Sequence, residues 1–89
     1  MASFTGMDIG AVRTLASQLS AKADEIDAIA NGLSSQLDGV QWVGFDADSF
    51  RSDWQSTHRI QLHNVATALR DASTRATANA TQQEQASAS

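Results

Sequence analysis

The chain of 89 residues contains no cysteine, no proline and no tyrosine. Without cysteine it can form no disulfide, no thiolate metal site and no reactive thiol, and the composition does not indicate a redox compartment. No run approaches the roughly 18 consecutive apolar residues that span a bilayer. The N-terminus also has no basic segment followed by an apolar one, so we expect no conventional signal peptide.

Basic residues are few as well. Six Lys and Arg stand against ten Asp and Glu, which makes the net charge −4. A protein that binds nucleic acid needs a basic face for the phosphates. The charge therefore argues against nucleic acid as a partner.

Motifs of catalysis and cofactor binding are missing from the sequence. There is no Gly-x-Ser-x-Gly, no glycine-rich phosphate loop and no pattern of a Ser-His-carboxylate triad. His58 and His63 are five residues apart, about 140° on a helix, whereas paired metal ligands are three or four apart. Asp24, Glu25 and Asp27 are interpreted as a solvated acidic face. We therefore expect no enzymatic activity, no catalytic residue, no metal site and no cofactor.

The apolar residues make up 42% of the chain and recur with the period of a helix. A first helix is predicted over about 8–38. Asp8 is the expected N-cap, Met7 and Val12 take the positions of a hydrophobic staple, and Gly39 is the expected stop. The apolar stripe of this helix comprises Val12, Leu15, Leu19, Ile26, Leu33 and Leu37, with Ala16, Ala23 and Ala30 beside them.

A second helix is predicted over about 46–80, followed by a polar, frayed tail over 81–89. Asp46 is the expected N-cap, and Phe45 and Phe50 take the staple positions. The apolar stripe of this helix comprises Ala47, Phe50, Trp54, Leu62, Val65, Leu69, Ala72 and Ala76, and His58 shares its face.

The predicted turn, over about 39–45, is short, so the two helices must pack antiparallel as an all-α hairpin in a single domain, 1–89. Each stripe covers an arc of roughly 120°, which is more than one neighbouring helix can cover. We therefore expect two hairpins to form a four-helix bundle, a dimer with an interface above about 1,000 Å². The residues expected in the core and the dimer interface are Val12, Leu15, Leu19, Ile26, Leu33, Leu37, Phe50, Trp54, Leu62, Val65 and Leu69.

The turn carries Trp42 and Gly44, and the second helix begins with Ala47, Phe50 and Trp54. A hairpin of this length with Trp-x-Gly at its turn resembles the WXG family, the small early-secreted-antigen-like proteins exported by type VII secretion systems of Gram-positive bacteria. The resemblance covers nearly the whole chain. It implies a non-enzymatic, ESX-like substrate or export partner, secreted from the cytoplasm as a folded dimer without a cleaved signal peptide.

In that family, Trp and Gly at the turn form one half of an export signal, and Tyr-x-x-x-Asp/Glu beyond the partner's second helix forms the other. The resemblance thus implies a recognition role for Trp42 and Gly44, and the motor ATPase of the system as a partner. This chain has no tyrosine, and nothing near Glu84 reproduces the second half. The regular stripes favour a homodimer, whereas the missing tail signal points to a heterodimer with a related hairpin.

Alternatives stay open at this stage. Trp42 either plugs the end of the bundle or is recognised by the secretion apparatus, and Gly44 permits a backbone geometry that a side chain would obstruct. The chain could instead be a non-exported helical adaptor or chaperone for another protein. It could also be a membrane-active effector, although the helices lack the Lys/Arg-rich polar face of interfacial helices, so we expect no membrane partner.

Overall fold

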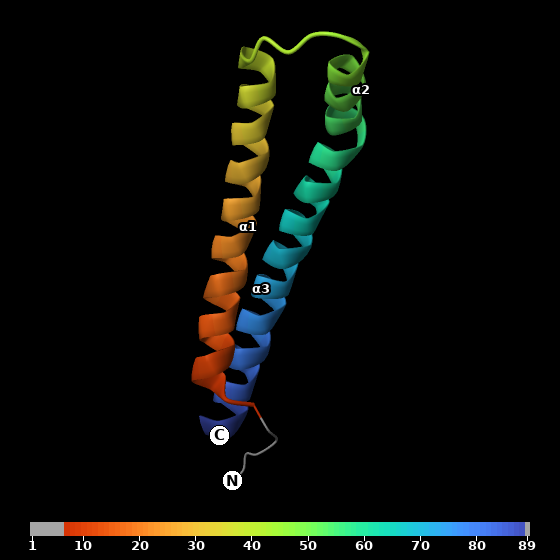
Figure 1. Ribbon diagram of the computed structural model, residues 1–89. Coiled ribbons are helices and arrows are strands. Elements are labelled where there is room, and N and C mark those ends of the chain that lie inside the picture. The colour runs from red at the N-terminus through yellow and green to blue at the C-terminus, as the bar shows by residue number, and fades with distance from the viewer. Residues whose placement is uncertain (1–6, 89) are drawn as a thin grey trace.

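The chain folds into two long helical arms joined by a short loop, as Figure 1 shows for the computed structural model, which describes residues 7–88. The first arm is α1 (Ile9–Gly39). The second arm runs without interruption through α2 (Phe45–Asp53), a π-helical turn η1 (Trp54–His58) and α3 (Arg59–Ala88). The arms are antiparallel in a molecule of 65 × 17 × 15 Å. The predicted all-helical hairpin is therefore confirmed.

The start of α1 follows the sequence closely. Asp8 is its N-cap, and the carboxylate oxygen of Asp8 accepts a hydrogen bond of 3.0 Å from the backbone N–H of Ala11. This bond satisfies one of the N–H groups that the first turn of a helix leaves without an intrahelical partner. At the other end, the N–H of Val40 bonds the carbonyl of Gln36 and closes the last turn.

The start of the second arm differs from the expectation. Its N-cap is Gly44 rather than Asp46, no side chain caps it, and Asp46 lies inside the first turn. The helix begins two residues earlier than expected, because Gly44 has a backbone conformation that turns the chain directly into Phe45. The side chain of Phe45 is 85% exposed as a result, so it forms no staple with Phe50.

The end of the second arm also differs. Helix α3 continues to Ala88, whereas a frayed tail was expected from residue 81; the last residue of that tail, Ser89, lies outside the described residues. Long-range contacts with the first arm support the extension. Ala80 is fully buried against the first arm, and the Arg13 guanidinium donates hydrogen bonds to Glu84 at 3.0 Å and to Thr81 at 3.4 Å.

A seam of small residues lies between the arms. On α1 the buried residues Ala16, Ala23 and Ala30 recur at intervals of seven. The Ser73 hydroxyl donates a hydrogen bond of 2.6 Å to the carbonyl of Ala16, which fixes the register of the two arms. Seven residues further on one arm and seven back on the other, Ala23 is therefore level with Ala66. Alanine side chains at these positions allow the two helix backbones to approach closely.

The seam widens toward the loop, where Figure 1 shows the arms diverging. The indole of Trp54 fills this wider part together with Ala30 and Leu37, and Leu33 and Leu62 pack against the cluster. The indole N–H of Trp54 donates a hydrogen bond of 2.8 Å to the Ser34 hydroxyl, so the polar atom of this buried ring is satisfied.

The π-helical turn decides which face of the second arm is buried. In it the N–H of Arg59 bonds the carbonyl of Trp54, five residues earlier, so the turn holds one residue more than an α-helical turn. Before the end of this turn the buried residues are Ala47 and Trp54, which are seven residues apart. After it they are Ala66 and Ala80, which are fourteen residues apart. The extra residue rotates the rest of the arm by about 100° relative to an unbroken helix.

The close packing in the seam can be tested by comparing a buried and an exposed alanine on α1. Replacing fully buried Ala23 by leucine should lower the free energy of unfolding by about 1–3 kcal/mol, because the larger side chain forces the arms apart. Replacing exposed Ala28 by leucine should change it by less than about 0.5 kcal/mol. Urea unfolding followed by circular dichroism at one protein concentration measures both. Equal effects would contradict the seam.

Candidate functional site

Arg51 organises the loop at the tip of the hairpin. Its guanidinium donates three hydrogen bonds to backbone carbonyls: to Leu37 at 3.1 Å, to Val40 at 3.2 Å and to Trp42 at 2.6 Å. The last turn of α1 has no basic residue of its own to serve its free carbonyls. Arg51 supplies that charge from the other arm, and in doing so it ties the loop to the second helix.

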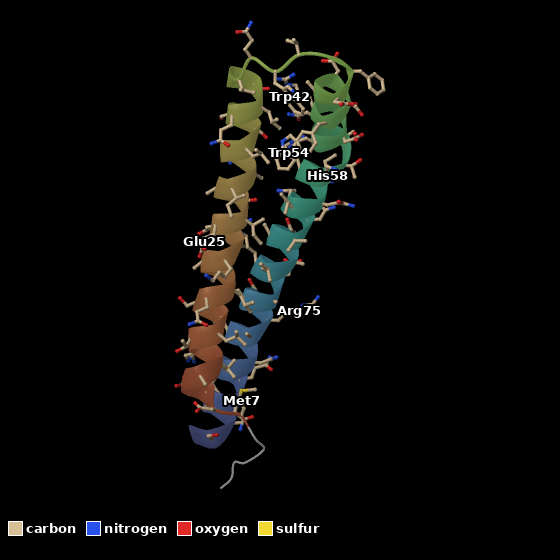
Figure 2. All side chains as sticks on the ribbon, viewed as in Figure 1. Met7, Glu25, Trp42, Trp54, His58 and Arg75 are labelled. Atoms are coloured by element: carbon tan, nitrogen blue, oxygen red, sulfur yellow. The ribbon has the colours of Figure 1, made fainter. Side chains whose placement is uncertain are left out.

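Trp42 lies over this arginine. The Arg51 guanidinium carbon is 5.7 Å from the centroid of the indole, a cation–π distance. The Phe50 ring lies 6.2 Å from the same ring, tilted by 46°. Trp42 nevertheless remains 41% exposed. Figure 2 shows it between the two arms near the tip, above Trp54. Trp42 therefore both packs the end of the hairpin and keeps part of its ring in contact with solvent.

Gly44 has φ 116° and ψ 178°, a region that is essentially restricted to glycine. Its carbonyl accepts a hydrogen bond of 3.0 Å from the N–H of Asp48 and so begins the second helix. A Cβ built on Gly44 would meet no atom within 4 Å. The restriction therefore comes from the backbone conformation and not from crowding, and it is the kind of geometry that the sequence assigned to this residue.

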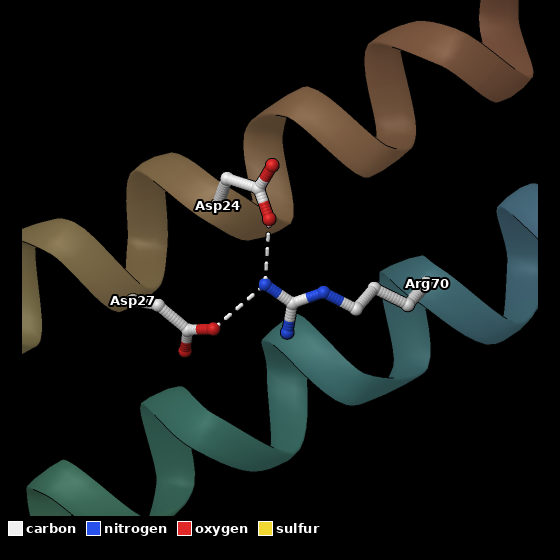
Figure 3. Close-up of polar contacts among 3 residues, drawn as sticks. All are labelled: Asp24, Asp27 and Arg70. Carbon is white, nitrogen blue, oxygen red and sulfur yellow. Dashed lines mark hydrogen bonds and ion pairs between the residues drawn. The ribbon is translucent and has the colours of Figure 1, made fainter.

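Polar contacts between the arms lie on one flank of the seam. Arg70 donates hydrogen bonds to Asp24 at 2.8 Å and to Asp27 at 2.7 Å, as Figure 3 shows. These bonds, that to Asp24 first, raise the pKa of the Arg70 guanidinium, which stays charged. The expected solvated acidic face holds for Asp24 and Glu25, which are exposed, whereas Asp27 is half-buried. The expectation missed that Asp24 and Asp27 pair with the opposite arm, while Glu25 pairs with Lys22 at 3.3 Å.

Heptad positions show that the large apolar residues of α1 lie on the other flank. Arg13 and Asp27, which make polar contacts, each precede a seam alanine by three residues. Leu19 and Ile26 precede a seam alanine by four residues, and this places them on the opposite side of the seam.

The same rule holds on α3. Arg70 follows the seam residue Ala66 by four residues, and Leu62 precedes Ala66 by four. In an antiparallel pair the side of Arg70 coincides with the polar side of α1, and the side of Leu62 coincides with its apolar side. We call the apolar side of the two arms the apolar flank. It comprises Val12, Leu15, Leu19, Ile26, Ile29 and Leu33 on α1, and Leu62, Val65, Leu69, Ala72 and Ala76 on α3.

The residues expected in the core and interface therefore fall into three groups. Leu37 and Trp54 are buried in the hairpin. Half-buried positions are held by Val12, Leu19, Ile26, Leu33, Leu62 and Leu69. The remaining three, Leu15, Phe50 and Val65, are exposed in the single hairpin.

One expectation for the second arm needs correction, and the π-helical turn changes which residues lie in the seam. Phe50 is not a core residue, because it packs on Trp42 at the tip. Val65 and His58 are exposed in the single hairpin, because the π-helical turn rotates them away from the seam, and a place for Val65 in a dimer interface stays a prediction. The prediction took the second arm as an unbroken helix and therefore did not include Ala66 and Ala80, which are fully buried.

The contacts of three arginines between the arms, Arg13, Arg51 and Arg70, were also missed. Arg70 follows Ala66 by four residues, a flanking position from which a side chain can reach an acidic pair on the other arm. Arg51 lies beyond the first turn of the second arm, and its carbonyl partners belong to α1 and the loop, so no local pattern indicated its role.

His58 and His63 are exposed, and no group of three His, Cys, Asp or Glu in the described part of the chain could hold a metal ion. Between residues 7 and 88, no helix has both the length and the apolar character required to cross a bilayer.

No family model matches the chain, and no curated protein or solved structure matches it either.

The backbone conformation at the tip can be tested by comparing Gly44 in the loop with Gly32 inside α1. Gly44→Ala should lower the free energy of unfolding by about 1–3 kcal/mol, because alanine is strained at this φ. Gly32→Ala should raise it by about 0.5–1 kcal/mol, since Gly32 lies within α1 and its Cβ would be unobstructed. Thermal and urea unfolding measure both changes. A neutral Gly44→Ala would show that the loop adopts another conformation in solution.

Proposed function

We propose that this chain is a small, non-enzymatic secreted protein, exported as a folded dimer through a type VII, ESX-like secretion system as a substrate or export partner. The observation that carries the proposal is a two-helix hairpin in which Trp42 and Gly44 lie at a tightly organised turn. The sequence resemblance to the WXG family supports the same function.

Dimerisation is proposed to use the apolar flank. Polar contacts occupy one side of the seam, whereas the other side leaves large apolar side chains partly in water. A second copy placed on this side with two-fold symmetry would cover the same residues on both chains. The product is a four-helix bundle, and we propose the homodimer because both arms contribute regularly spaced residues to the flank. A related hairpin is the alternative partner.

Recognition by the motor ATPase is proposed at the tip. Arg51 and Phe50 hold Trp42 in a fixed place, so a receptor would meet a preorganised surface and not a mobile loop. Export takes the dimer from the cytoplasm to the extracellular space without a cleaved signal peptide.

A non-exported adaptor or chaperone is the second candidate, and the far end of the hairpin favours it. The family's tail signal lies beyond the second helix, yet here Glu84 lies within α3 and pairs with Arg13. No tyrosine is present anywhere in the chain. Fractionation of culture separates the candidates: an adaptor stays in cells whose secretion system is intact.

The dimer proposal is tested by two substitutions of similarly exposed residues. Val65 on the apolar flank is 49% exposed, and Ile60, which shares its heptad position with Thr81 on the polar side, is 43% exposed. Val65→Asp should dissociate the dimer, because the interface would bury an unpaired charge, while the helicity of each chain is kept. Ile60→Asp should leave the dimer intact. Sedimentation velocity measures both, and a wild-type monomer at micromolar concentration would refute the assembly.

The export proposal is tested at Trp42. Trp42→Ala should abolish secretion while the dimer persists, because the residue lies at the tip and not on the apolar flank. Trp42→Phe keeps an aromatic ring against Phe50 and Arg51 and is the matched control. Immunoblots of supernatant and cell fractions report export, and sedimentation of the purified variants reports assembly. If Trp42→Ala loses its dimer, Trp42 is a packing residue only.

A further inference from the structure

Apolar side chains at the tip point away from the hairpin. Val43 is 81% exposed and Phe45 85%, and Val40 beside them is also exposed. None of the three belongs to the apolar flank, which ends at Leu33 on one arm and begins at Leu62 on the other. A second copy that covers that flank therefore leaves the tip free. Adjacent exposed apolar residues of this kind mark interaction sites.

The loop that carries these side chains is held rigidly. Arg51 binds three of the carbonyls around it, and Gly44 sets the turn between Val43 and Phe45. The two motif residues Trp42 and Gly44 thus support the loop, and their neighbours Val43 and Phe45 project from it. A loop already ordered before binding loses little conformational entropy when a partner docks.

The charge around the tip is negative. Asp38, Asp46 and Asp48 are exposed, and none of them takes part in an ion pair within the described residues. Asp46 and Asp48 suit the start of a helix, but Asp38 lies in the last turn of α1, where the helix dipole disfavours a carboxylate. Helix stability therefore does not explain Asp38. Between residues 38 and 53 the single basic residue is Arg51, which faces inward to carbonyls.

We infer that these residues form a docking surface for a protein partner that presents an apolar pocket bordered by Lys or Arg. This tip surface comprises Val40, Val43 and Phe45, with Asp38, Asp46 and Asp48 around them. Its negative charge disfavours an anionic membrane, and it also disfavours the tip of a second copy. The inference deepens the proposed function and rests on it in taking the tip as the recognition end.

The probe for the test is a phage-displayed library of random peptides. Wild-type protein is the bait, and the Val43→Ser/Phe45→Ser double variant is the counter-selection. Enriched peptides should combine aromatic or aliphatic residues with Lys or Arg. Their affinity should fall at least about tenfold for the double variant, since two apolar side chains lose their burial. Ile60→Ser, which removes an exposed apolar side chain far from the tip, should bind them as wild type does.

The charge contribution is measured separately. Asp38→Asn/Asp48→Asn should weaken the same peptides several-fold at low salt, and the difference from wild type should shrink as salt is raised. Peptides without basic residues, or peptides that bind the double variant equally well, would overturn the inference.

Two further measurements decide between occupants. Vesicles of phosphatidylglycerol should not bind the wild type; binding that the Val43→Ser/Phe45→Ser variant loses would identify a lipid surface and overturn the inference. The double variant should also keep the wild-type dimer by sedimentation, whereas a lost dimer would show that a second copy covers the tip.

Export is read independently of binding. If the wild type is not exported, the proposed function fails while the peptide selection still decides the inference. If the wild type is exported and the double variant is exported equally well, the tip surface is not the recognition surface and the inference fails.

Discussion

The close contact of the two arms through a row of alanines is the constraint on which the rest of the structure depends. Ala16, Ala23 and Ala30 leave no room for larger side chains between the helices, so Leu19 and its apolar neighbours lie beside the seam. Arg70 and its two aspartates occupy the other side. A chain with large residues in the seam could bury most of its apolar surface by itself. This one keeps a partly exposed apolar flank, which is why we propose a dimer.

The tip is organised by a different interaction. Because α1 ends without a basic residue, its free carbonyls are met by Arg51 from the opposite arm, and the same guanidinium holds the loop and supports Trp42. The tip and the apolar flank are therefore separate surfaces, one at the end of the hairpin and one along its length. Under the proposed function, one surface would pair with another hairpin and the other would meet a receptor.

Local features of the sequence were sufficient for much of the fold. Helical periodicity predicted both arms, the Asp8 cap was placed correctly, and the turn was placed at the residues around Trp42 and Gly44. Errors arose where a local pattern was extended over a long distance. The face of the second arm was predicted from one unbroken helix, so the burial of Ala66 beyond the π-helical turn at Trp54 was missed.

The sequence by itself determined that the chain is helical, where it turns and which residue begins α1, because caps and periodicity act over a few neighbouring residues. Only the tertiary structure decided that Ala66 and Ala80 are buried, that α3 continues to Ala88 and that Arg51 and Arg70 join the arms. Each of these depends on a residue far away in the chain, and its position follows from the register in which the arms pack.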